Sequence, residues 1–166
     1  MSTDGLTISF PATDTTEQRR TKVAAMAEGA VQVNMAEIQE GATIDVSRLR
    51  YENPRGSKMQ EIGSLREVAR RGRATCIEIC AIVVAADRLD GVNSFVQILA
   101  TKYRDKVRPL VYHAVVRRPD GSVYDASELL KGYNTSGELW QRTGHCCPSC
   151  MLDEPCQGNC SCKGGH

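Results

Sequence analysis

The segment Thr75–Leu89 constrains the fold more than any other part of the sequence. Its side chains are apolar around nearly the whole circumference of a helix until Asp87, which predicts a helix in the centre of a domain. The letters T-C-I-E at its start fit a capping box, with Thr75 as the N-cap residue and Glu78 reaching back to it. A chain of 166 residues is long enough to surround such a helix with a hydrophobic core.

The thiol of Cys76 falls at the first position of this predicted helix. The unpaired N–H groups of a first turn and the helix dipole favour an anion there. The thiolate is the nucleophilic form of cysteine, so the position suits an attacking group. Cys80 lies one turn further on the same face, where no free N–H groups remain, and we expect an inert buried thiol. The alternative interpretation of Cys76 is a small core side chain, because free cysteines are often buried.

A second segment, Tyr112–Ser127, predicts a β-hairpin that carries a histidine and an aspartate. A three-residue loop over 119–121 places Val115 opposite Asp125. His113 and Asp125 are then diagonal neighbours on one face, ~7–8 Å apart at Cα. Because the apolar Val115 shares this face, we expect the central helix to cover it. The alternative interpretation is a surface histidine beside a surface aspartate.

The segments GRATCIEICAIVVAADRLDGV and YHAVVRRPDGSVYDAS together resemble the transglutaminase-like core of the papain-like cysteine peptidase superfamily. Members of this family typically show a cysteine that opens a helix, then His-Ala-x-Val, an Asp-Gly turn and an aspartate. The resemblance covers about Arg70–Ser127. Many members have Gly or Asp next to the cysteine, where this chain has Thr75. The resemblance implies a Cys-His-Asp site on Cys76, His113 and Asp125.

The function implied by the resemblance is that of a thiol hydrolase or acyltransferase acting on amide bonds. Cys76 would attack a carbonyl as thiolate, His113 would take and return the proton, and Asp125 would orient the ring and stabilise its charge. The substrate would be a protein or peptide, and no cofactor is expected for catalysis.

The expected fold class is α+β, because helices come first and an antiparallel meander follows. The resemblance specifies a papain/transglutaminase-like core, in which the helix that opens the motif packs centrally on an antiparallel sheet. We expect a transglutaminase-like domain over 1–131, with its motif-bearing core at 57–131, and a small Cys-rich C-terminal segment over 132–166. The predicted helices and strands are helices over 15–28 (with Gly29 as the stop), 58–70 (capped by Ser57) and 75–89, and strands over 94–103, 108–118 and 122–126, followed by one helical turn over 127–131.

The C-terminal segment contains six of the eight cysteines. Cys147-x2-Cys150 has the spacing of a zinc knuckle, and Cys160-x-Cys162 would complete a tetrahedral site. Structural zinc would stabilise a segment too short to have its own core. Disulfides are the competing interpretation, in an oxidising environment. An iron–sulfur site and a tail of free thiols remain as further alternatives.

Charge and hydropathy restrict the partners. The net charge of +1 gives no reason to expect a nucleic acid partner, and no apolar run approaches the ~20 residues that a membrane span needs. The N-terminus lacks a basic region followed by an apolar block, so we expect synthesis in the cytoplasm without classical export. The alternative function is that of a non-catalytic structural protein of a large assembly such as a phage virion. It would keep the fold, contact other subunits, and use the Cys-rich tail for crosslinking or metal binding.

Overall fold

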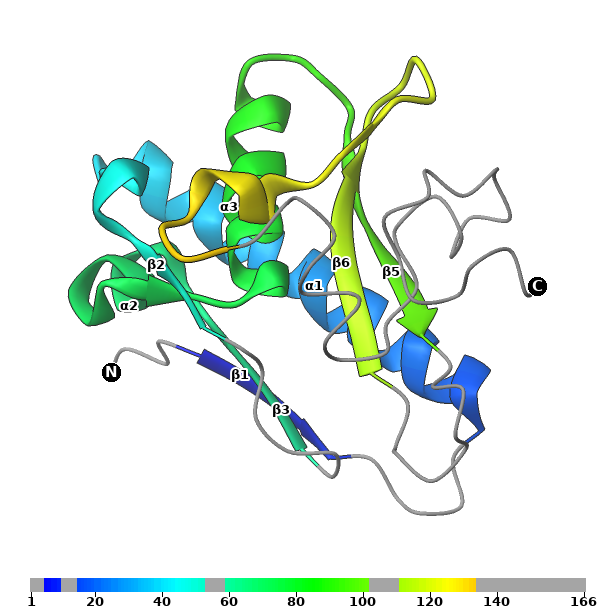
Figure 1. The fold of residues 1–166 in the computed structure, drawn as a ribbon. Coiled ribbons are helices and arrows are strands. Elements are labelled where there is room, and N and C mark those ends of the chain that lie inside the picture. Colours follow the sequence, from blue (N-terminus) through cyan, green and yellow to red (C-terminus); the bar gives the residue numbers. More distant parts are fainter. Residues whose placement is uncertain (1–4, 10–14, 53–58, 102–110, 134–166) are drawn as a thin grey trace.

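The computed structural model of the protein describes residues 5–9, 15–52, 59–101 and 111–133, and the fold of these parts is α+β (Figure 1). The helices are α1 (Thr16–Gln39), α2 (Leu65–Arg71) and α3 (Cys76–Leu89), with two short 3₁₀ helices, η1 (Val46–Arg48) and η2 (Ala126–Leu129). The strands are β1 (Gly5–Ser9), β2 (Arg50–Tyr51), β3 (Met59–Gly63), β4 (Arg73–Ala74), β5 (Phe95–Thr101), β6 (Val111–Arg117) and β7 (Val123–Tyr124).

The strands form three small sheets in the described part of the chain. Strand β1 pairs antiparallel with β3, and β2 pairs parallel with β4. The third sheet is an antiparallel meander in the order β5-β6-β7. Strand β4 leads directly into α3, so its pairing with β2 fixes the point at which this helix begins.

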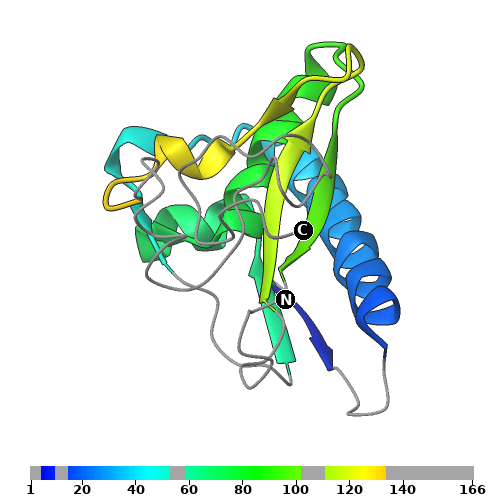
Figure 2. The ribbon, with the colours of Figure 1, turned by 45° about the vertical axis from the view of Figure 1, so that its right-hand side comes forward.

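Helix α3 runs through the middle of the molecule, as its apolar circumference predicts (Figures 1 and 2). It packs on α1, on the sheet strands β5 and β6, and on η2. Every residue from Cys76 to Ile82 is buried. Burial of apolar surface on all sides of α3 therefore builds the core, and it holds the start of the helix inside the protein.

Helix α1 is longer than the sequence predicts, and Gly29 does not end it. The helix continues to Gln39. A Cβ at position 29 would lie 3.3 Å from Cδ1 of Leu6, so glycine leaves room there for strand β1 to approach the helix. The second half of α1 is fixed by tertiary contact, since the buried Asn34 side chain accepts a hydrogen bond from the Leu65 N–H at 2.7 Å.

The predicted helix over 58–70 is wrong in its first half. Residues 59–63 form strand β3, because β1 supplies a pairing partner that is far away in the sequence. Ser64, whose side chain accepts from the Glu67 N–H, caps the short helix α2, which ends at the left-handed Gly72. The predicted cap Ser57 lies outside the described residues.

The predicted hairpin is confirmed, with shorter strands. The Gly121 N–H donates to the Arg118 carbonyl at 2.9 Å, and Val116 pairs with Tyr124, which is the register expected of a loop over 119–121. Strand β7 ends at Tyr124, earlier than predicted, because the chain turns into η2 at the next residue. No helix in the described ranges is long and apolar enough to cross a membrane.

Candidate functional site

The capping box at the start of α3 is present as predicted. The Thr75 hydroxyl accepts from the Glu78 N–H at 3.3 Å, and the Glu78 carboxylate accepts from the Thr75 N–H at 2.9 Å. The same carboxylate also accepts from the Gly63 N–H at 2.6 Å and from the Arg71 guanidinium. Glu78 therefore joins strand β3 and helix α2 to the first turn of α3, which positions Cys76.

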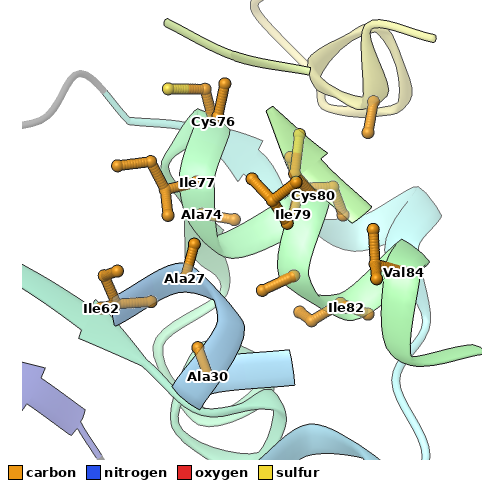
Figure 3. Close-up of a cluster of buried hydrophobic side chains, with 14 of the residues drawn as sticks. Ala27, Ala30, Ile62, Ala74, Cys76, Ile77, Ile79, Cys80, Ile82 and Val84 are labelled. Carbon is orange, nitrogen blue, oxygen red and sulfur yellow. The ribbon is translucent and has the colours of Figure 1, made fainter. Parts of the chain in front are cut away.

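Cys76 is the first residue of α3 and is 1% exposed. Helix geometry leaves the N–H groups of Cys76 and Ile77 without partners inside the helix. Cys80 lies one turn further and is fully buried (Figure 3). Burial, followed by the proximity of Cys76 and Asp125, raises the pKa of Cys80 well above its ordinary value. Cys80 is therefore a neutral thiol at neutral pH, as the sequence predicts.

His113 lies on β6, where it pairs with Leu99 of β5, and it is 4% exposed. Its Nε2 atom lies 3.3 Å from Oδ2 of Asp125, and its ring also hydrogen-bonds the side chain of Cys76. Burial alone would lower the pKa of His113, but the contacts with Asp125 and Cys76 outweigh it and raise this pKa to about 9. The imidazole is therefore held between an acidic partner and the thiol.

Asp125 is the N-cap residue of η2, and both of its carboxylate oxygens have partners. Oδ1 accepts from the Ser127 N–H at 3.2 Å, and Oδ2 accepts from the Tyr133 hydroxyl at 2.7 Å and faces His113. Burial would raise the pKa of Asp125, but the contacts with His113, Tyr133 and Ser127 together lower it. Asp125 is thus a fixed carboxylate at neutral pH.

The structure brings the three predicted residues together in one place. Cys76 comes from the start of α3, His113 from β6, and Asp125 from the end of the hairpin. The hairpin has the predicted register as far as Tyr124, but Asp125 follows the end of β7 and is not a strand neighbour of His113. The chain leaves the sheet at Asp125, so this carboxylate caps η2 and turns towards the ring.

Two residues of the site were not found from the sequence, Tyr51 and Tyr133. Their rings lie 4.8 Å apart between centroids at an angle of 55°, and the Tyr133 ring is parallel to the His113 ring at 6.3 Å. Tyr51 lies on β2 and Tyr133 follows η2, so the two meet only in three dimensions. No local pattern around either tyrosine indicates this contact.

The arrangement supplies the parts that a nucleophilic thiol needs. Cys76 offers sulfur, His113 a base in contact with it, and Asp125 a carboxylate that orients the base. The N–H groups of Cys76 and Ile77, which have no partner inside the helix, could bind a developing oxyanion.

A metal site is a separate question. Within the described residues, no group of three or more His, Cys, Asp or Glu side chains is arranged to hold a metal ion. The predicted zinc ligands lie outside the described residues: Cys147, Cys150, Cys160 and Cys162.

No protein family, curated protein or solved structure matches this chain. The geometry of the site is therefore the ground on which a function can be proposed.

Proposed function

We propose that the protein is a thiol hydrolase or acyltransferase that acts on amide bonds of a protein or peptide, with a core of the papain/transglutaminase-like kind. One observation carries the proposal. Cys76 begins a buried helix and contacts His113, whose ring also contacts Asp125. A nucleophile, a base and an orienting carboxylate in this order of contact are the components of a catalytic triad.

In the first half of the reaction, the Cys76 thiolate attacks the carbonyl carbon of the amide. The oxyanion that forms accepts hydrogen bonds from the N–H groups of Cys76 and Ile77. His113, protonated in the pair with Cys76, donates a proton to the amide nitrogen as the C–N bond breaks. An amine leaves, and the acyl group stays on Cys76 as a thioester.

In the second half, water or an amine attacks the thioester carbonyl while His113 accepts its proton. The C–S bond breaks and Cys76 leaves as thiolate, so that the imidazolium–thiolate pair is restored. Water as acceptor gives a hydrolase, and an amine gives an acyltransferase. Asp125 keeps its charge throughout and stabilises the imidazolium.

One observation favours a second candidate, a non-catalytic protein that keeps this arrangement for stability. Cys76 is 1% exposed and His113 4%, so a substrate reaches the sulfur only if neighbouring chain moves. A buried ion pair that no substrate reaches would be a structural feature of the core. Reactivity of Cys76 towards a small reagent separates the two candidates.

The test is alkylation by a low dose of iodoacetamide at neutral pH, followed by site-resolved mass spectrometry. Cys80 is a matched internal control, because it lies one helix turn away and is equally buried. A difference between the two thiols therefore does not come from exposure; because the raised pKa of Cys80 contributes to it, the variant His113→Ala identifies the part that is due to the imidazole. We expect Cys76 to react at least tenfold faster than Cys80, a ratio that corresponds to ~1.4 kcal/mol of barrier.

The variant His113→Ala tests the cause of this reactivity. Without the imidazole, the rate at Cys76 should fall towards that of Cys80. If Cys76 and Cys80 react equally slowly in the unmodified protein, or if His113→Ala leaves the Cys76 rate unchanged, the proposed enzymatic function is wrong.

A further inference from the structure

We propose that Tyr133 is a positioning residue of the site, which holds the Asp125 carboxylate against His113 through its hydroxyl group. The proposal rests on the proposed thiol chemistry and adds a fourth residue to it. Tyr133 does not contact a reacting atom in this scheme, since it acts through Asp125.

The hydroxyl of Tyr133 donates to Oδ2 of Asp125 at 2.7 Å, the oxygen that also faces His113 Nε2 at 3.3 Å. The other oxygen is occupied by the Ser127 N–H. A carboxylate with a donor on each oxygen cannot rotate about its χ2 bond without losing one of them. Tyr133 therefore fixes the oxygen that the imidazole uses.

The Tyr133 ring is itself held from two sides. It lies parallel to the His113 ring, and the Tyr51 ring packs against it at 4.8 Å between centroids. The backbone nearby is tied to β2, because the Tyr51 N–H donates to the Lys131 carbonyl at 2.8 Å. Asp125 is thus connected through Tyr133 and Tyr51 to strand β2, which lies outside the hairpin.

Five ionisable groups of the described residues face Asp125. These groups are His113 on β6, Tyr133 after η2, Tyr51 on β2, Tyr124 on β7, and Cys80 on α3. Of these, the Tyr133 hydroxyl donates to the carboxylate and His113 lies beside it as an ion-pair partner, and these two groups lower the pKa of Asp125. Removal of the Tyr133 hydroxyl should raise this pKa and free the carboxylate to rotate.

The experiment is the pH dependence of Cys76 alkylation in Tyr133→Phe, which keeps the ring and removes the hydroxyl. Tyr124→Phe is the matched control, because the contacts that lower the pKa of Asp125 come from His113, Tyr133 and Ser127 and not from the Tyr124 hydroxyl; the Tyr124 ring lies under the Arg118 guanidinium. In Tyr133→Phe, the acid limb of the profile of alkylation rate against pH should move to higher pH by about one unit. The loss of a hydrogen bond to a charged group changes a pKa by about that amount. The Tyr124→Phe profile should superimpose on that of the unmodified protein.

A double-mutant cycle shows whether Tyr133 acts through Asp125. Asp125→Asn should lower the Cys76 rate, and Tyr133→Phe added to it should lower the rate no further. An additional fall would overturn the proposal. An unchanged pH profile in Tyr133→Phe would also overturn it. The same holds if the alkylation rate falls by one factor at every pH while the thermal unfolding midpoint falls as well, because a merely structural role gives that result.

Failure of the proposed function gives a different result. In that case Cys76 of the unmodified protein reacts no faster than Cys80 at any pH, and the positioning role falls with it. If Cys76 is reactive and the pH profile of Tyr133→Phe is unchanged, the proposed thiol chemistry is retained and Tyr133 has no positioning role in it.

Discussion

The Glu78 carboxylate lies 2.6 Å from the backbone nitrogen of Gly63, although fifteen positions separate the two residues in the sequence. Glu78 is 1% exposed, and it also closes the capping box with Thr75 and binds Arg71. A residue that the sequence shows only as a helix cap therefore anchors strand β3 to the first turn of α3. The position of Cys76 depends on this anchor.

Gly63→Ala should destabilise the protein. A Cβ at this position would lie 2.8 Å from Oε2 of Glu78 and 3.0 Å from Cγ of Glu67. Because the Glu78 carboxylate is held by several donors, it cannot move aside cheaply. We expect a loss of about 1–3 kcal/mol in the free energy of unfolding, measured by urea denaturation.

Gly29→Ala is the matched control for this prediction. A Cβ there meets only the end of the Leu6 side chain, at 3.3 Å, and alanine is favoured over glycine inside a helix by about 1 kcal/mol. The variant should be neutral or more stable. If the free energy of unfolding falls equally in the two variants, the contact between Glu78 and Gly63 does not contribute to stability in the way described here.

Glu78→Gln removes the charge that faces Arg71 and leaves one acceptor oxygen for donors that now use two. We expect the free energy of unfolding to fall by about 2 kcal/mol. This is less than the effect of breaking a fully buried ion pair, because the Arg71 side chain is 26% exposed. Chemical denaturation measures the loss. Glu128→Gln, at an exposed position, should change stability by no more than about 0.5 kcal/mol. A Glu78→Gln protein as stable as the Glu128→Gln control would contradict this account of the cap.

Stability should fall as the solution becomes alkaline, because of His113. Its pKa is about 9 in the folded protein and near 6.5 in the unfolded chain. The raised pKa means that the stabilisation is complete below the unfolded value and is lost as the pH rises through about 9. The contribution is on the order of 3 kcal/mol, and unfolding in urea at about pH 6 and about pH 10 measures it.

The variant His113→Gln is the comparison that isolates this effect, since other groups also titrate in the same range. Its stability should change less between the two pH values than that of the unmodified protein. Identical pH dependence in both proteins would contradict the raised pKa of His113.

The parts of the fold that were predictable from sequence are those with local causes. Thr75 and Glu78 are three residues apart, so the capping box is visible in four letters. The loop over 119–121 sets the hairpin register within a few residues, and Asp125, which directly follows β7, lies beside His113. The candidate site follows from these two local features once α3 is recognised as central.

The parts that were not predictable depend on contacts between distant segments. Residues 59–63 form a strand because β1 pairs with them, and the second half of α1 is held by the hydrogen bond between Asn34 and Leu65. Tyr51 and Tyr133 come from separate elements and meet at the site. In each case the deciding partner is more than twenty residues away, beyond the range of periodicity and capping patterns.

The most direct test of the central claim is an NMR titration of the His113 imidazole. Variants of His145 and His166 assign its signal among the three histidines of the chain. Because the ring contacts both Cys76 and Asp125, its pKa should be about 9, and Cys76→Ala should lower it. A pKa at or below the ordinary 6.5, unchanged in Cys76→Ala, would show that the thiol and the imidazole do not form a pair and would contradict the account.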